Sequence, residues 1–222
     1  MDIEEAIRTR KSIRAFKKKP VPIKVIKKIL TLASLSPSGS NTQPWNVHVL
    51  TGKYLKLFTN ETKKEFLSNF NNLSLERLNY MKEYREPYKA RRKKVGWDLY
   101  SILDIKKGDY KKTKQFHSLN YEFFGAPVGL IFSIEKDLGW MSWLDYGMFM
   151  QSITLSARNY GLDTCSQAAW GLVHKKVHNL LKLKKNLTVH CGMALGYGNK
   201  KSKVNSLVTE RAEISKFCKF LN

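Results

Sequence analysis

The sequence predicts one α+β domain, and three features of the chain lead to that prediction. Residues 3–8 and 24–35 place apolar side chains at the spacing of an α-helix. Residues 128–134 and 187–195 are short apolar runs of the kind that form buried strands. No internal repeat or linker divides the 222 residues, and a hydrophobic content of 42% is ordinary for a globular protein. We therefore expect a single domain that spans residues 1–222.

The first part of the chain is predicted to form two helices, a turn and a strand. Two prolines within residues 20–22 interrupt the helical pattern, so residues 3–8 and 24–35 should be separate helices. Residues 47–50 are a brief apolar run that stops at Gly52, as expected of a strand that enters the core. The segment before this strand is rich in Pro, Ser, Gly and Asn, which favour a turn.

The middle of the chain is predicted to leave the domain as a helical excursion. Residues 53–84 are polar with a helical pattern, and an aromatic and basic stretch around Trp97 follows them. Gly96 and Gly108 should break this stretch. Long insertions of this kind are often active-site lids. We interpret residues from about 76 to 112 as a mobile helical lid over the substrate.

The second half contains a helix that is apolar on nearly every face, over residues 141–157. Such a helix must be buried on two sides. A helix at the centre of a dimer interface has this pattern, and so does a helix enclosed in the core of a monomer. The C-terminal tail, residues 212–221, can pack as an arm on a neighbouring subunit, because it carries four large apolar side chains: Ile214, Phe217, Phe220 and Leu221.

The chain is strongly basic, with 40 Lys and Arg against 18 Asp and Glu and a formal net charge of +22. Nucleic-acid-binding proteins carry such an excess. The lysines are spread along the chain, however, and no zinc-finger, RNP or helix-turn-helix signature accompanies them. We expect a solvated basic surface without a specific nucleic-acid partner, whose positive field attracts anionic substrates or nucleotide phosphates.

The sequence predicts neither a membrane segment nor a metal site. No stretch approaches the roughly 20 apolar residues of a membrane span, and the acidic N-terminus is unlike a signal peptide, so we expect a cytoplasmic protein. His174 and His178 have the i, i+4 spacing of a helical metal pair, but they lack the H-E-x-x-H pattern and a third ligand. Three widely separated cysteines suggest free thiols: Cys165, Cys191 and Cys218.

Three separated fragments together indicate a flavin mononucleotide (FMN) site. The first fragment supplies three cations and a hydroxyl that can hold a dianionic phosphate: Arg10, Lys11, Ser12 and Arg14. Arg211, far along the chain, can close the other side of the phosphate as a planar fork. The turn at residues 36–45 has small side chains that let a flat heterocycle approach the backbone. Taken singly, the first fragment could only cap a helix, and the turn could only end one.

The order and spacing of these fragments resemble the nitroreductase family of FMN-dependent oxidoreductases, in particular its nitrobenzoate-reductase-like branch. The resemblance covers nearly the full length, in blocks at residues 7–16, 36–45, 123–129, 161–170, 191–197, 204–205 and 209–211. It implies a nitroreductase-like α+β fold, with a central, mostly antiparallel sheet flanked by helices. It also implies an intertwined homodimer with two flavins at the interface.

The resemblance assigns the FMN phosphate and ribityl chain to the first fragment. Arg10, Lys11 and Ser12 match the family residues that hold these groups, and Arg211 matches the one that completes the phosphate clamp. Lys11 keeps the positive charge at its position but lacks the fork geometry of an arginine. Leu207 stands where related sequences often have a further arginine.

The resemblance assigns the flavin ring to two further segments. Ser38 and Asn41, in the turn that begins at Pro37, meet the cofactor from the partner subunit, and Gln43 supplies an amide near the ring or ribityl chain. The segment that contains Gln167 and Ala168 matches one whose backbone N–H groups point at flavin N5 and O4. Donors there stabilise charge on the reduced ring. The alternative for Gln167 is that it is a loop residue only.

The resemblance implies an FMN-dependent NAD(P)H oxidoreductase with a ping-pong cycle. No G-x-G-x-x-G motif is present, so NADH or NADPH should visit as a substrate that stacks on the flavin. A nitroaromatic, quinone or similar electrophile then takes the same place, and no catalytic side chain is required. Within the fold, the alternative is a flavin-dependent dehalogenase or a flavin-degrading enzyme. The alternative from another class is a basic nucleic-acid-associated protein without redox activity.

Overall fold

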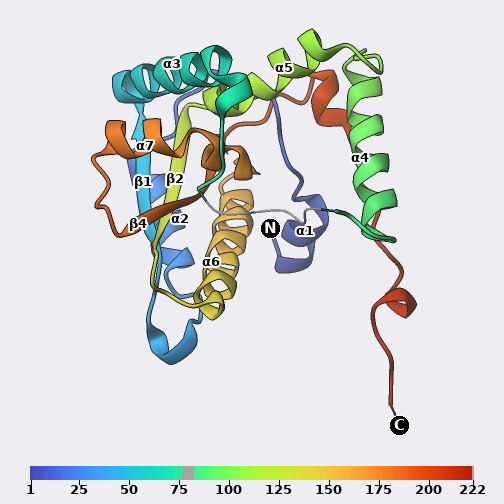
Figure 1. The fold of residues 1–222 in the computed structure, drawn as a ribbon. Helices are drawn as coiled ribbons and strands as arrows, with labels where there is room; N and C mark the ends of the chain where they lie inside the picture. The colour runs from blue at the N-terminus through green and yellow to red at the C-terminus, as the bar shows by residue number, and fades with distance from the viewer. Residues whose placement is uncertain (77–82, 222) are drawn as a thin grey trace.

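The computed structural model describes residues 1–76 and 83–221, and within them a four-stranded antiparallel sheet forms the centre of the domain (Figure 1). The order across the sheet is β1-β2-β4-β3, and each neighbouring pair is antiparallel. The strands are β1 (Asn46–Thr51), β2 (Val128–Glu135), β3 (Asp163–Gln167) and β4 (Leu187–Gly196). The predicted central antiparallel sheet is therefore confirmed.

The two central strands, β2 and β4, are apolar along nearly their whole length. Every residue of β2 except Glu135 is buried, and so is every residue of β4 except the half-buried His190. A central strand that is covered on both faces has no side toward water, so its sequence is a continuous apolar run instead of an alternating one. This is why residues 128–134 and 187–195 predicted the two strands correctly.

Helices cover both faces of the sheet. On one face α2 and α6 pack over the strands, and Ile29, Phe132 and Phe149 belong to one buried cluster there. On the other face α3, α7 and the 3-10 helix η4 (Ala168–Val173) enclose a second cluster. The helices are α1 (Ile3–Thr9), α2 (Ile23–Ala33), α3 (Gly52–Ser68), α4 (Tyr88–Ile102), α5 (Tyr110–Ser118), α6 (Trp140–Asn159) and α7 (His174–Leu181).

Trp170 of η4 lies directly on the sheet because β4 carries a glycine beneath it. A Cβ at Gly192 would come within 2.3 Å of Trp170 Cδ1. Trp170 is fully buried and stacks on Phe123 of the 3-10 helix η3 (Leu119–Gly125), with 4.5 Å between the ring centroids. Close packing of this kind is one reason for a glycine inside a strand.

The helical pattern after β1 predicted too long a helix. α3 ends at Ser68 and a 3-10 turn (Phe70–Asn72) follows, whereas the prediction extended to residue 84. Ser and Asn dominate residues 68–74, and their side chains compete for backbone hydrogen bonds and favour turns. The end of the predicted range includes residues 77–82, which lie outside the described residues.

The predicted excursion does contain helices, although one of its predicted breaks was wrong. α4 continues through Gly96, because a single glycine in a helix costs only about 1 kcal/mol relative to alanine. Gly108, with a φ of 87°, does separate α4 from α5. No residue of α4 is buried, and Figure 1 shows this helix at the side of the molecule away from β1, with the C-terminal tail running past it.

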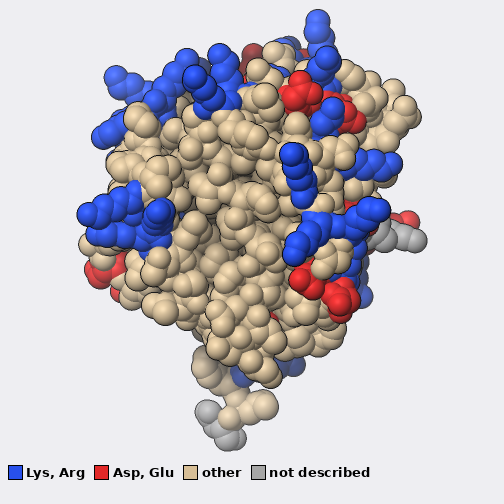
Figure 2. Space-filling model, turned by 90° about the vertical axis from the view of Figure 1, so that its left-hand side faces the viewer, with Lys and Arg blue, Asp and Glu red and all other residues tan. Residues whose placement is uncertain are grey.

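Figure 2 shows where Lys and Arg lie on one face of the molecule. Figure 2 looks onto the side of the molecule where β1 and α7 lie in Figure 1, and Lys and Arg gather around its margin while the middle is largely uncharged. Within residues 1–76 and 83–221, no helix has the length and apolar character needed to cross a bilayer.

Candidate functional site

The first fragment is the phosphate segment, residues 10–14. It runs from the end of α1 along the edge of the sheet. Ser12 pairs with Thr164 of β3 in a parallel bridge, and the N–H of Ile13 donates to the Thr164 carbonyl at 3.0 Å. Ile13 is buried, so the backbone of the segment is held from below. The polar side chains of the segment remain half-buried or exposed: Arg10, Lys11, Ser12 and Arg14.

Three of these side chains influence the pKa of Cys165 of β3. Burial raises the pKa of the Cys165 thiol to about 11, while the positive charge of Arg14, a hydrogen bond with Ser12 and the charge of Arg10 act in the opposite direction. Within the segment, Arg14 Nη1 donates to the Ser12 carbonyl at 3.4 Å. Cations and a hydroxyl on one short segment can hold a dianionic phosphate.

Asn205, which the sequence reasoning did not assign to the site, ties the phosphate segment to the C-terminal part of the chain. Its buried side chain accepts from the Arg14 N–H at 2.7 Å and donates to the Ala15 carbonyl at 2.8 Å. Its own carbonyl accepts from Lys11 Nζ at 2.6 Å. Asn205 lies in the block at residues 204–205 that resembles the family, but a single asparagine in a loop does not by itself indicate a ligand-binding site.

Arg211 lies beside α4 on the chain that follows η5 (Lys203–Ser206). Its guanidinium donates to the carbonyl and hydroxyl of Thr209 at 3.0 and 2.7 Å, and to the Glu210 carbonyl at 2.9 Å. Together with Arg91 of α4 it lines a surface cavity of about 520 Å³. These contacts place Arg211 next to α4, and its closure of a phosphate held by residues 10–14 stays a prediction.

The loop at residues 36–45, called the ring loop below, has an unusual backbone. Ser40, Asn41 and Gln43 have φ values of 49°, 57° and 48°, in the left-handed region that costs a residue with a side chain roughly 1–2 kcal/mol. Ser38 Oγ accepts from the Gln43 N–H at 3.0 Å, and Gln43 Nε2 donates to the Asn41 carbonyl at 3.2 Å. Strain of this kind clusters at ligand-binding sites. The loop is largely exposed in a single chain.

α6 holds the start of the ring loop by two polar contacts. The Gly39 N–H donates to Asp145 Oδ2 at 3.2 Å, and the hydroxyls of Ser36 and Ser152 are 2.7 Å apart. The exposed Pro37 lies between these two anchors. Asp145 is only 5% exposed, and the sequence reasoning missed it because it looked like one polar residue in an apolar helix.

Gln167 ends β3, and its side chain serves the local fold. Its Nε2 donates to the Asn120 carbonyl at 2.8 Å, and its Oε1 accepts from Trp170 Nε1 at 3.4 Å. The side chain is buried, and Ala168, the first residue of η4, is half-buried. The role that the resemblance gives to the backbone of these two residues stays a prediction.

The histidines and cysteines noted in the sequence are spread through the fold. His174 Nδ1 lies 2.9 Å from the Gly171 carbonyl, and His178 Nε2 lies 3.6 Å from the carboxylate of Glu76. In the part of the chain that the structure describes, no group of three or more His, Cys, Asp or Glu is arranged to hold a metal ion. Burial raises the pKa of the Cys191 thiol, which is consistent with a packed, protonated side chain.

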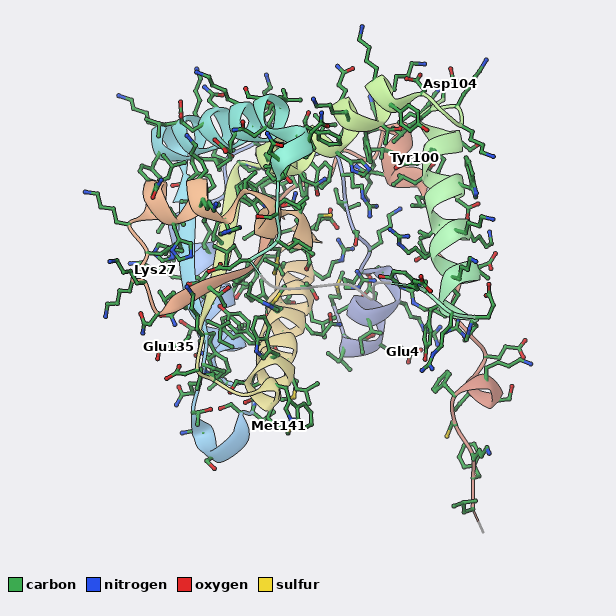
Figure 3. All side chains as sticks on the ribbon, viewed as in Figure 1. Glu4, Lys27, Tyr100, Asp104, Glu135 and Met141 are labelled. Carbon is green, nitrogen blue, oxygen red and sulfur yellow. The ribbon has the colours of Figure 1, made fainter. Side chains whose placement is uncertain are left out.

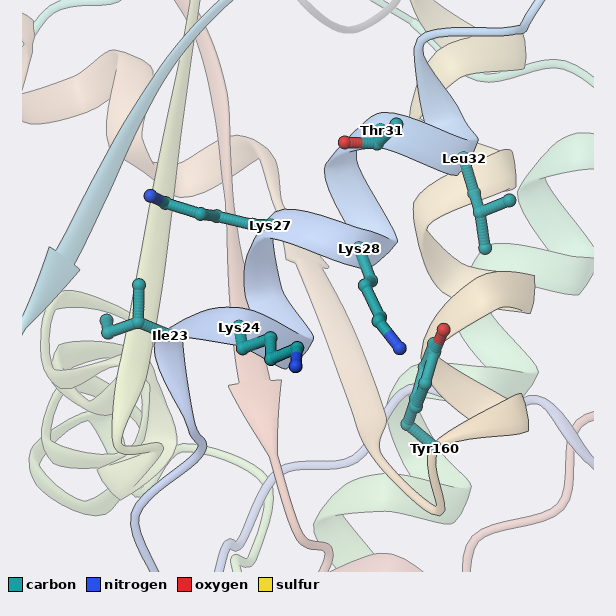
Figure 4. Close-up of a pocket in the computed structure, with 7 residues that line it drawn as sticks. All are labelled: Ile23, Lys24, Lys27, Lys28, Thr31, Leu32 and Tyr160. Carbon is teal, nitrogen blue, oxygen red and sulfur yellow. The ribbon is translucent and has the colours of Figure 1, made fainter.

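Two further surface cavities carry several cations each. The first, of about 660 Å³, lies on α2 and includes Lys24, Lys28 and Tyr160 in its lining. Figure 4 shows that Lys28 extends toward the Tyr160 ring, while Lys27, which also lines the cavity, extends away from Tyr160. The second cavity, of about 540 Å³, lies on α4 and has Arg92 and Trp97 in its lining.

Known proteins resemble this chain over nearly its whole length. Residues 7–197 match the Nitroreductase family. The 4-nitrobenzoate reductase of Pseudomonas putida is 37% identical over 226 residues, an alignment that covers 99% of this chain and 96% of that protein. The chloronitrobenzene nitroreductase of Comamonas testosteroni is 34% identical over 220 residues, which cover 99% of this chain and 97% of that protein.

Solved structures show the same fold. The FMN and NADPH-dependent nitroreductase NfnB from Sphigopyxis sp. strain HMH matches with a TM-score of 0.96 at 28% identity, over 100% of both chains. NfnB from Mycobacterium smegmatis in complex with NADPH matches with a TM-score of 0.94 at 24% identity, over 99% of this chain and 97% of that one. The predicted nitroreductase-like α+β fold is thereby confirmed. Since the family match and relatives above 30% identity extend along most of its length, this chain belongs to the nitroreductase family.

Proposed function

We propose that this protein is an FMN-dependent oxidoreductase that uses NADH or NADPH to reduce nitroaromatic compounds. The observation that carries the proposal is the phosphate segment at the edge of the sheet, whose backbone is bonded to Thr164 and Asn205 and whose cationic side chains stay half-buried or exposed, in a chain of this family. The curated relatives are named for the reduction of nitrobenzoate and chloronitrobenzene, and the Sphigopyxis neighbour is described as FMN and NADPH-dependent.

The residues present fit FMN. In this proposal Arg10, Ser12 and Arg14 bind and orient its phosphate with their half-buried or exposed side chains, and Asn205 keeps the backbone beneath them in place. The ring loop offers small side chains and a strained, exposed backbone that a flat ring can approach. When bound, FMN supplies the two-electron chemistry that links a nicotinamide to an electrophile.

In this proposal the nicotinamide donor and the nitroaromatic acceptor bind one after the other at the same site on the flavin. Support comes from the sequence, which has no dinucleotide fingerprint of its own. Quinones are flat electrophiles of similar size, and we include them among the acceptors. Water supplies the protons, so the role of this chain is to bind, orient and enclose, with no side chain assigned to proton transfer.

We also propose that the active form is a homodimer. Tyr146, Phe149 and Ile153 are buried on the side of α6 that faces the domain. On its other side, Leu144 is 53% exposed and Met148 is 41% exposed. β1 forms an edge of the sheet, and an unpaired edge with free backbone groups invites another strand. The C-terminal tail ends in exposed apolar side chains: Phe217, Phe220 and Leu221. A second copy of the chain, with its C-terminal tail packed on the first, would cover these exposed apolar surfaces.

The cytoplasm is the compartment that we propose. Cys165, Cys191 and Cys218 are free thiols, and free thiols are usual where the surroundings are reducing.

The experiment that tests the cofactor assignment is denaturation of the purified protein and chromatography of what it releases. We expect FMN and not FAD, because the site has one phosphate-binding segment. Arg10→Ala combined with Arg14→Ala should purify with little FMN, while Lys28→Ala on α2 should keep it. Recovery of FAD, or of no flavin after reconstitution, contradicts the assignment and favours a basic protein without redox activity.

Steady-state kinetics test whether donor and acceptor share one binding site. Initial rates with NADPH against a nitroaromatic acceptor should give parallel double-reciprocal lines, since the donor leaves before the acceptor enters. Lines that intersect would show a ternary complex and rule out the shared site.

Light scattering tests the dimer. The FMN-loaded protein should have twice the mass of one chain, and Leu144→Glu together with deletion of residues 212–221 should yield monomers. A wild-type monomer that binds FMN would exclude both the dimer and a contribution of the ring loop to the partner's site.

A further inference from the structure

The helix α4 carries a concave, cationic and aromatic surface on one stripe. Residues 89, 92, 93, 96, 97 and 100 follow one another at helical spacing, so they share a face, and they line the cavity of about 540 Å³ together with Tyr84. Gly96 keeps the middle of the stripe open, because a Cβ there would meet no atom within 4 Å. The volume is in the usual range of small-ligand sites, which is roughly 300–1,000 Å³.

The cations of this cavity are not neutralised by the protein. Within residues 1–76 and 83–221, no carboxylate lies within ion-pair distance of Lys89, Arg92 or Lys93. Lys94, on the other side of the same helix, pairs with both Asp98 and Glu210. Three unpaired cations on one stripe favour a ligand with several negative charges.

The aromatic side chains of the cavity offer flat surfaces beside these cations. The guanidinium of Arg92 lies over the Tyr84 ring, 4.8 Å from its centroid. Trp97 is 44% exposed, so its ring is available for stacking. Tyr100 is at the α5 end of α4, as Figure 3 shows, and its hydroxyl lies 3.0 Å from His117 Nε2. A ligand that suits this surface has a flat ring as well as anionic groups.

The helix α4 is connected to the phosphate segment through the C-terminal part of the chain. Lys94, on the side of α4 turned away from the cavity, is 3.3 Å from Glu210, and α4 also packs on η5. η5 contains Asn205, which is bonded to Lys11 and Arg14. The helix α4 itself therefore stands between the cavity and the C-terminal chain at Glu210, so a ligand that reaches both the cavity and the residues assigned to FMN has to be extended.

We propose that the cavity on α4 binds the adenosine-phosphate end of the dinucleotide donor, with Trp97 stacked on the adenine and Arg92, Lys89 and Lys93 on the phosphates. The inference rests on the proposed function. A dinucleotide combines a flat base with several phosphate charges, whereas a nitroaromatic acceptor lacks phosphates. Because NADPH carries one phosphate more than NADH and the cavity has three unpaired cations, the site favours NADPH.

Calorimetry with 2′,5′-ADP, which is the isolated end of NADPH, tests the site directly on the FMN-loaded protein. Arg92→Ala and Trp97→Ala should each weaken binding about 10-fold or more, because one contact to a charged group or one stacked base has roughly that effect. Lys28→Ala, in the basic cavity on α2, should leave binding unchanged. Binding that is lost in Lys28→Ala and kept in Arg92→Ala would move the site to α2 and overturn the proposal.

Kinetics with a truncated donor separate this inference from the proposed function. Arg92→Ala should raise KM for NADPH about 10-fold, keep kcat, and leave the reaction with reduced nicotinamide mononucleotide unchanged, because that donor lacks the adenosine end. Failure of the truncated donor to reduce the wild-type flavin contradicts the proposed function, whereas 2′,5′-ADP binding still decides the inference. If Arg92→Ala instead yields monomers in light scattering and 2′,5′-ADP does not bind, the stripe is a subunit contact and the proposal falls.

Discussion

Two cationic parts of this protein, the phosphate segment and α4, are attached to the domain in opposite ways. The phosphate segment is bonded to the edge strand β3 through Ser12 and Ile13, and Asn205 fastens it from the other side. α4 has no buried residue, and its contact with the C-terminal chain includes the exposed pair of Lys94 and Glu210.

The difference teaches what each part can do. A site that must bind the same phosphate in every cycle gains from a rigid support, because groups already in place lose little freedom on binding. A helix with few buried contacts opens at low free-energy cost, which suits a part that must admit different donors and acceptors. The lid role of α4 is a prediction that follows from this contrast.

The variant Asn205→Ala should break the rigid side of the comparison and have the largest effect. It removes the acceptor of the Arg14 N–H and the donor to the Ala15 carbonyl, both partly buried. We expect a loss of about 3 kcal/mol in the free energy of unfolding and a clear drop in FMN affinity, measured by urea unfolding and flavin titration. Ser206→Ala, which loses only a local bond to the Lys203 carbonyl, is the control. Equal effects in both variants would show that Asn205 has no special role.

The variant Arg211→Ala tests whether this arginine binds the FMN phosphate or only packs beside α4. If it closes the phosphate clamp, the dissociation constant of FMN should rise by an amount equivalent to roughly 1.5–3 kcal/mol, because a charge-assisted contact is lost. Fluorescence titration of the apo-protein measures this. Lys216→Ala, which lines the same surface cavity, should leave FMN binding unchanged. An unaltered constant for Arg211→Ala would assign the residue to α4.

Glu76 fastens the chain to the sheet at the start of the predicted excursion, and its effect depends on pH. Burial raises the pKa of Glu76, but the nearby Thr188 hydroxyl, the Val189 N–H, Lys136 and His178 together outweigh burial and leave this pKa below its usual value. The carboxylate therefore contributes stability above the unfolded pKa of about 4.3, and this contribution is lost as pH falls through the folded pKa.

Replacing Glu76 should therefore lower the free energy of unfolding at neutral pH, and it should lower it by a smaller amount in acid. We expect Glu76→Gln to lose about 1–2 kcal/mol of unfolding free energy at pH 7, with a smaller difference from wild type below pH 4. Urea unfolding across this pH range is the measurement, and the exposed Glu83→Gln is the control. A constant difference at all pH values would show that the charge of Glu76 is not involved.

The smallest effect is expected for Lys94→Ala on α4. Hydrogen bonds and charges from Asp98 and Glu210 raise the pKa of Lys94, but the side chain is exposed and water screens its ion pairs. The thermal unfolding midpoint should stay within experimental error of wild type. A drop of several degrees would mean that α4 is held firmly, and the contrast with the phosphate segment would fail.

The edge of the sheet shows where prediction from sequence stopped. β3 was not predicted as a strand, because the residues Asp-Thr-Cys-Ser-Gln alternate poorly and Ser166 is exposed. α7 was noticed only through the spacing of His174 and His178, since a helix of eight residues has too few turns for a clear pattern. An edge element is stabilised by neighbours that lie far away in the chain, and a local pattern does not contain them.

The sequence by itself determined the α+β class, the two central strands and the apolar α6, and it predicted which residues of the phosphate segment and ring loop hold FMN. These features are local: a fully buried strand is a continuous apolar run, and a phosphate needs cations and a hydroxyl. Only the tertiary structure decided that Asn205 and Asp145 hold these two parts, that Arg211 lies beside α4, and that α4 carries an unpaired cationic stripe. Each depends on contacts between residues far apart in the chain, and their energies arise only when the fold brings the partners together.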